Sequence, residues 1–76
     1  MEWVETPQST SIAGFGYEAA AQVLLVFFNS GELYRYFGVK AEVFVEFKRA
    51  ESKGKYLVAS IRNNYRFERV LTTGTI

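Results

Sequence analysis

Short runs of apolar and aromatic residues, divided by polar or glycine-containing turns, predict β-strands in the first half of the chain. Residues 11–17 form a candidate strand whose glycines, Gly14 and Gly16, indicate a bulge or a close backbone approach. Residues 23–28 are apolar on both faces, as expected for a central strand covered on both sides. Residues 33–37 complete a three-stranded antiparallel meander over residues 11–37.

The turn between the second and third predicted strands gives the clearest local signal. Asn29-Ser30-Gly31 fits a three-residue hairpin loop, whose last residue needs a positive φ that glycine adopts easily. This loop sets Phe28 opposite Glu32. Because side chains alternate, one face carries Leu24, Val26, Phe28, Tyr34 and Tyr36, and the other carries Val23, Leu25, Phe27, Leu33, Arg35 and Phe37.

After Gly38 the apolar period becomes helical. The first predicted helix places these residues on one face: Val39, Val43, Phe44, Phe47 and Ala50. Ser52 can cap a second helix, whose predicted inner face is Leu57, Val58, Ile61 and Tyr65. The expected fold class is α+β: a three-stranded antiparallel β-meander followed by two α-helices packed on one face. We expect residues 1–10 to be a flexible N-terminal lead-in, 11–67 the single domain and 68–76 a C-terminal tail.

Composition excludes several kinds of chemistry. The chain has 76 residues, 49% of them hydrophobic, with no cysteine, histidine or aspartate. Disulfides, zinc sites of cysteine and histidine, and catalysis by a histidine base are therefore excluded. We expect a non-enzymatic protein without metal or cofactor. No apolar run approaches the ~20 residues of a membrane helix, and the acidic N-terminus is unlike a secretory signal, so we expect a cytoplasmic protein without a membrane partner.

Four short groups of residues recur in an order typical of one family. They are Ile12, Gly16, Tyr17 and Glu18; Leu24, Val26, Phe28, Ser30 and Gly31; Tyr34-Arg35-Tyr36; and Ala50, Ser52, Gly54 and Tyr56, followed by Ile61, Arg62 and Tyr65. Together they resemble the KTSC domain, named for the C-terminus of lysyl-tRNA synthetases and found in stand-alone small bacterial and phage proteins. The chain departs from the family at Lys40, where proline is common, and at Leu57-Val58, where Phe-Asn is common. The resemblance implies no catalytic activity or cofactor. RNA binding has been suggested for the family, so the resemblance leads us to expect it here.

Positive charge is concentrated in the second half of the chain. Residues 48–76 hold seven basic residues and two glutamates, whereas residues 1–47 hold two basic residues and six glutamates. Candidate contacts to RNA, either a tRNA or a single strand, are Lys53, Lys55, Arg62 and Arg66. A continuous basic stripe requires the second helix to run through to Arg69. If the helix ends near Asn63, the following residues alternate as a short strand or packed tail, and the charges are solvated surface.

Two groups of aromatic and apolar residues each have two interpretations. Tyr34 and Tyr36 either belong to the core or form an exposed pair on which bases stack. Leu25, Phe27 and Phe37 either form an interface, in a homodimer or with another protein, or are covered by the N-terminal segment with Trp3 and Val4. The sequence therefore leaves open an RNA-binding module and, as the alternative, an interaction or self-association module.

Overall fold

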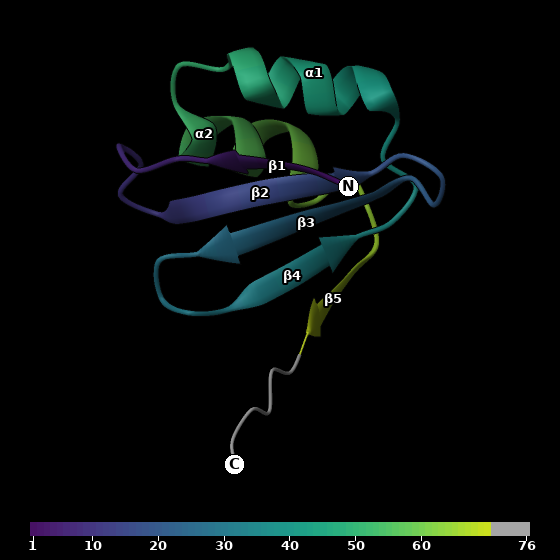
Figure 1. Ribbon diagram of the computed structural model, residues 1–76, viewed down its shortest axis with the longest axis horizontal. Coiled ribbons are helices and arrows are strands. Elements are labelled where there is room, and N and C mark those ends of the chain that lie inside the picture. Colours follow the sequence, from purple (N-terminus) through teal and green to yellow (C-terminus); the bar gives the residue numbers. More distant parts are fainter. Residues whose placement is uncertain (71–76) are drawn as a thin grey trace.

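The computed structural model describes residues 1–70, which form an antiparallel sheet and a helical region between its last two strands (Figure 1). The five strands pair with their neighbours in sequence, in the order β1-β2-β3-β4-β5. They are β1 Glu2–Glu5, β2 Ile12–Glu18, β3 Val23–Phe28, β4 Leu33–Tyr36 and β5 Phe67–Val70. The helical segments are α1 Ala41–Arg49, α2 Lys53–Tyr56 and a π-helical turn, η1, Leu57–Ile61. The α+β class predicted from the sequence is confirmed.

Two edge strands extend the meander, so the expectation of three strands is wrong. Residues 1–10, expected to be a flexible lead-in, contribute β1, which pairs with β2 and sets Val4 opposite Phe15. Residues 68–70, expected in the tail, belong to β5, which sets Phe67 opposite Tyr36. Both strands are four residues long and half of each is charged, so neither has the apolar run that marks an inner strand. Residues 71–76 of the expected tail lie outside the described residues.

The two glycines of β2 make room for a tryptophan ring. A Cβ atom on Gly14 would lie 2.8 Å from the ring of Trp3, and one on Gly16 would lie 2.6 Å from it. The pairing of β2 with β3 also shifts between Ile12 and Gly14, which is a β-bulge. The predicted bulge is therefore present, while the group that closely approaches the glycines is mainly a side chain and not the backbone named as the alternative.

The hairpin loop has the predicted geometry. Gly31 has a φ of +98°, and its N–H donates to the carbonyl of Phe28 at 2.9 Å. The N–H of Phe28 donates to the carbonyl of Glu32 at 2.8 Å, which confirms that these residues face each other. The register that follows pairs Val26 with Tyr34 and places the two predicted faces as expected.

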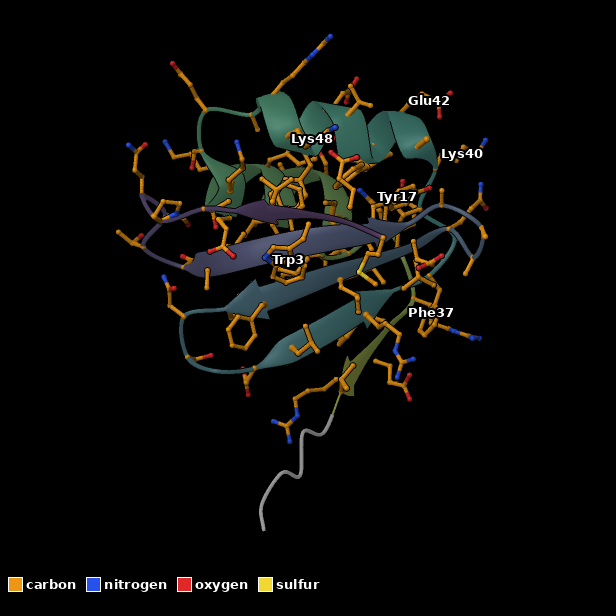
Figure 2. All side chains as sticks on the ribbon, viewed as in Figure 1. Trp3, Tyr17, Phe37, Lys40, Glu42 and Lys48 are labelled. Atoms are coloured by element: carbon orange, nitrogen blue, oxygen red, sulfur yellow. The ribbon has the colours of Figure 1, made fainter. Side chains whose placement is uncertain are left out.

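One hydrophobic cluster joins the sheet to the helical region. Phe15 of β2 stacks on Phe47 of α1 with 4.0 Å between ring centroids, and Tyr17 stacks on Phe44 at 4.9 Å. The Tyr17 hydroxyl donates to the carbonyl of Val39 at 2.5 Å, close to the start of α1 (Figure 2). Burial, with a smaller contribution from the Glu42 carboxylate, raises the pKa of Tyr17. The other buried members are Ile12, Leu24, Val26, Tyr36, Val39, Leu57 and Ile61.

The helical region ends earlier than the basic stripe requires. Ser52 caps α2 as predicted, because its hydroxyl accepts from the N–H of Lys55 at 3.3 Å. Helical structure stops at Ile61 and the chain turns into β5, so no helix carries Arg66 and Arg69. Val58, expected on the inner face, is 54% exposed, because Leu57 and Ile61 alone turn inward. Within residues 1–70, no helix is long and apolar enough to cross a membrane.

Candidate functional site

An open groove is lined by three parts of the chain that lie far apart in the sequence. They are residues 4–11 at the end of β1 and in the loop after it, Lys48 with the segment 51–63 that contains α2 and η1, and the hairpin loop with aromatic residues of β3, β4 and β5. In Figure 1, α1 and α2 lie near the edge of the sheet formed by β1 and β2, while β4 and β5 lie toward the opposite edge. The lining therefore combines a polar loop, a helical wall and aromatic rings.

Four rings, hereafter the aromatic cluster, contribute to the groove: Phe28, Tyr34, Tyr36 and Phe67. Tyr34 and Phe67 stack with 5.5 Å between ring centroids and 27° between planes. Tyr36 is buried, with 3% of its surface exposed, whereas Phe67 is 51% exposed. The two tyrosines therefore differ. Tyr36 belongs to the core, whereas Tyr34 is half-buried and stacks on the exposed ring of Phe67.

The candidate RNA-binding residues do not all lie together. Lys53, Lys55 and Arg62 line the groove, but Arg66 lies with its guanidinium 5.4 Å from the ring centroid of Phe37. The ammonium of Lys53 donates to the carbonyls of Lys48 and Ala50 at the end of α1. These are carbonyls that a helix end leaves without a helical partner. The ammonium of Lys53 is therefore already bound to backbone carbonyls of the protein itself.

Lys55 and Arg62 are the basic residues of the groove whose charged groups make no hydrogen bond or ion pair within residues 1–70. Of the residues that the structure describes, no carboxylate lies within ion-pair distance of either side chain. Arg62 lies close enough to the buried Tyr36 hydroxyl to affect its protonation. Burial and the neighbouring Tyr34 raise the pKa of Tyr36, and the positive charge of Arg62 opposes that rise. Because Arg62 and the aromatic cluster line the same groove, they belong to one site.

Loop 6–11, the third part of the lining, is held by hydrogen bonds. The buried Thr6 donates its hydroxyl proton to the carbonyl of Ile12 at 2.5 Å, and Ser9 Oγ accepts from the N–H of Ile12 at 3.0 Å. Asn29 in the hairpin loop donates its side-chain amide to the carbonyl of Ser9 at 3.1 Å. Sequence reasoning missed this loop. The signal available was the run of threonine, proline and serine, residues that form turns by bonding to the nearby backbone.

The other side of the sheet carries a second candidate site, hereafter the open sheet face: Trp3, Leu25, Phe27, Leu33 and Arg35. Leu25 and Phe27 lie there as predicted, and Phe27 is 38% exposed. Of the N-terminal residues expected to cover this face, Trp3 lies over the glycines of β2 and is itself 42% exposed (Figure 2), whereas Val4 packs against the core cluster. Arg35 forms an ion pair with Glu68 at 3.4 Å beside these apolar residues. Phe37 follows β4 and contacts Arg66, at the end of this face.

Solved structures support the fold over nearly the whole chain. A KTSC domain protein from Yersinia pestis superposes with a TM-score of 0.83 at 24% sequence identity. The match covers 91% of this chain and 96% of that one. At this level of identity the likeness concerns the fold.

Curated relatives include lysine–tRNA ligases of three organisms and small proteins of about the length of this chain. A lysine–tRNA ligase of Nostoc sp. is 34% identical over 64 residues, which are 84% of this chain but 11% of that enzyme. A protein of Stutzerimonas stutzeri is 38% identical over 64 residues, which are 83% of this chain and 90% of the relative. The KTSC domain matches residues 8–65. This match and the length shared with the small relative show that the chain belongs to the KTSC domain family.

Proposed function

We propose that this protein is a non-enzymatic module that binds RNA weakly, through phosphate contacts made by Lys55 and Arg62. The proposal rests on one observation: both unpaired basic side chains line the groove that also holds the aromatic cluster. Three glutamates line the groove as well, but two of them have partners. Glu5 accepts from the Trp3 indole N–H at 3.1 Å, and Glu32 pairs with Arg69 at 3.1 Å. The bond from the indole leaves the negative charge of Glu5 in place. Outside ion pairs the groove is lined by Lys53, Lys55 and Arg62 against Glu5 and Glu51, so a formal charge of +1 faces a ligand.

The lysine–tRNA ligase among the relatives supports the choice of RNA. That enzyme acts on tRNA by its name, and a segment similar to this chain makes up 11% of it. A segment joined to a tRNA ligase lies close to RNA, so tRNA is the first probe to test and the cytoplasm is the compartment we propose. Catalysis is not part of the proposal, because the chain has no histidine, cysteine or aspartate.

Two phosphate contacts predict weak, salt-dependent binding. Affinity should fall in the non-specific range of about 10⁻⁴–10⁻⁶ M at physiological salt. The logarithm of affinity should decrease with the logarithm of salt concentration with a slope of about −1.4, because each contact to a single strand contributes about −0.7. Titration of the protein into labelled tRNA and into an unstructured RNA strand, at several salt concentrations, measures both quantities.

The matched variants are Arg62→Glu and Arg66→Glu, which reverse the same charge four positions apart in the sequence. Arg62 lines the groove and Arg66 does not, so we expect Arg62→Glu to abolish detectable binding and Arg66→Glu to leave most of it. Thermal melting checks that both variants fold. Absence of binding at low salt, or equal effects of the two substitutions, would contradict the proposal.

A second candidate function is self-association through the open sheet face. The observation in its favour is that Trp3 and Phe27, 42% and 38% exposed, lie on the same face as Leu25 and Leu33. Large aromatic side chains grouped on an exposed face are typical of interfaces. The pair of Arg35 and Glu68 on this face gives two copies opposite charges with which to align. We propose a second copy of the chain as the partner.

A further inference from the structure

We propose that the groove takes unpaired nucleic-acid strands in preference to duplexes, because bases stack on the rings of Phe67 and Tyr34. The inference deepens the RNA-binding proposal and rests on it. Phosphate contacts alone do not distinguish a strand from a duplex, whereas stacking requires a base whose face is accessible. The aromatic cluster provides rings on which the accessible bases of an unpaired strand can stack.

The rings of the aromatic cluster pack against one another, from the buried Tyr36 to the exposed Phe67. Tyr34 and Tyr36 lie 6.4 Å apart between centroids with 23° between their planes, and Tyr34 and Phe67 lie 5.5 Å apart with 27°. Tyr34 is therefore roughly parallel to each of its two neighbours, while Tyr36 and Phe67 are tilted by 38° with 5.8 Å between their centroids. Phe28 contacts Tyr34 edge-on at 5.4 Å and supports it from β3. The rings are thereby held in place before any ligand binds.

Exposure of Phe67 is the observation that points to a ligand. Phenylalanine has no polar atom that favours contact with water, yet half of this residue is exposed at an edge strand. Every nucleobase presents an apolar face, and stacking on an aromatic ring tolerates any sequence. A base on Phe67 would cover its exposed half and extend the contact between Tyr34 and Phe67.

The basic residues lie where a strand's backbone would run. Arg62, just after η1, and Lys55, in α2, line the same groove as the four rings of the aromatic cluster. A strand with one base on the aromatic cluster can therefore direct its phosphates toward these two side chains. In a duplex the bases already stack on one another, so only the phosphate contacts would remain.

The test compares one unstructured pyrimidine RNA strand with the duplex that it forms with its complement. The same DNA strand serves as a further ligand, because stacking does not need the 2′-hydroxyl. The variants are Phe67→Leu and Phe27→Leu, which remove an exposed aromatic ring from opposite faces of the sheet. Leucine keeps apolar volume, and thermal melting confirms that each variant folds.

We expect the RNA and DNA strands to bind more tightly than the duplex at equal salt. Phe67→Leu should weaken binding of the strands by about fivefold or more, the lower limit for loss of one stacked base, and Phe27→Leu should not weaken it. In NMR spectra the ring protons of Phe67 and Tyr34, and not those of Phe27, should shift when a strand is added.

Three results would overturn the inference. If the duplex binds as tightly as the strand and Phe67→Leu has no effect, bases do not stack on the aromatic cluster. The proposal that Lys55 and Arg62 contact phosphates then remains, but the inference about unpaired strands fails. If both leucine variants weaken binding equally, the effect is not specific to the aromatic cluster. If neither strand nor duplex binds, the RNA-binding proposal fails as well.

Discussion

The Trp3 ring fills the space that a side chain at position 14 would need. All three atoms nearest to an added Cβ on Gly14 belong to the Trp3 ring, at 2.8 to 3.0 Å. Gly14→Ala should therefore destabilise the protein by about 1–3 kcal/mol, the usual cost of overpacking. The same substitution in a Trp3→Leu background should cost clearly less, because the smaller side chain leaves space. Urea unfolding of the four proteins in the double-mutant cycle measures the coupling.

Gly54 provides the control for that cycle. An added Cβ there would meet Ser11 at 3.5 Å, an ordinary contact, and the residue lies in α2. Gly54→Ala should be neutral or stabilise the protein, because alanine favours a helix. If Gly14→Ala also proves neutral, or costs as much without the tryptophan ring, the close packing of Trp3 on β2 is wrong.

At this same scale, sequence reasoning identified residue types better than it identified their partners. Lys53 was a candidate for RNA contact because of its charge, but its ammonium binds the carbonyls at the end of α1. Arg66 has the same charge and lies against Phe37. Charge is visible in a sequence, whereas the distance from a side chain to a carbonyl or a ring depends on the folded chain. Lys55 and Arg62 are the two candidates left with available charge in the groove.

Among the elements, the inner strands and the hairpin could be predicted and the edges could not. β2, β3 and β4 bury apolar side chains, which leaves a periodic pattern, and Gly31 fixes the turn. β1 and β5 lie outside residues 8–65, the part that matches the family, and each has only a few apolar residues. The groove depended on these unpredicted parts, because β5 supplies Phe67 and the segment after β1 supplies the loop.

The end of α1 gives a prediction at the scale of elements. The Lys53 side chain donates to two carbonyls there, so Lys53→Met should lower the free energy of unfolding by about 1 kcal/mol. Affinity for an RNA strand should stay nearly unchanged, because this ammonium is occupied in the free protein. Urea unfolding and RNA titration of the same sample measure the two effects.

Lys55→Met is the matched substitution, and it should show the reverse result. Its ammonium has no carboxylate partner in residues 1–70, so stability should hardly change while RNA affinity falls. If Lys53→Met weakens binding as much as Lys55→Met does, Lys53 leaves α1 to contact phosphate, and its assignment to the fold is wrong.

For the whole molecule, the open sheet face predicts association between copies. We expect sedimentation to show dimers at micromolar concentration and the melting temperature to rise with protein concentration. Phe27→Glu should abolish both effects, because it places a charge within the apolar contact. Val45→Glu is the control: Val45 is 39% exposed, close to the 38% of Phe27, but lies on α1.

A monomer at every concentration tested would remove the open sheet face as a contact between copies. Equal effects of the two glutamate substitutions would also contradict it, since only one of them lies on this face. Neither result bears on the groove, whose rings lie on the other side of the sheet.

The position of Trp3 also determines what an optical measurement of this protein reports. The chain has one tryptophan, and its ring lies on the glycines of β2 rather than in the hydrophobic cluster. Intrinsic tryptophan emission is therefore a local reporter of whether β1 is attached, while far-ultraviolet circular dichroism follows the sheet and helices together. Emission that changes at lower denaturant than the dichroism would reveal an edge strand that detaches before the rest of the domain unfolds.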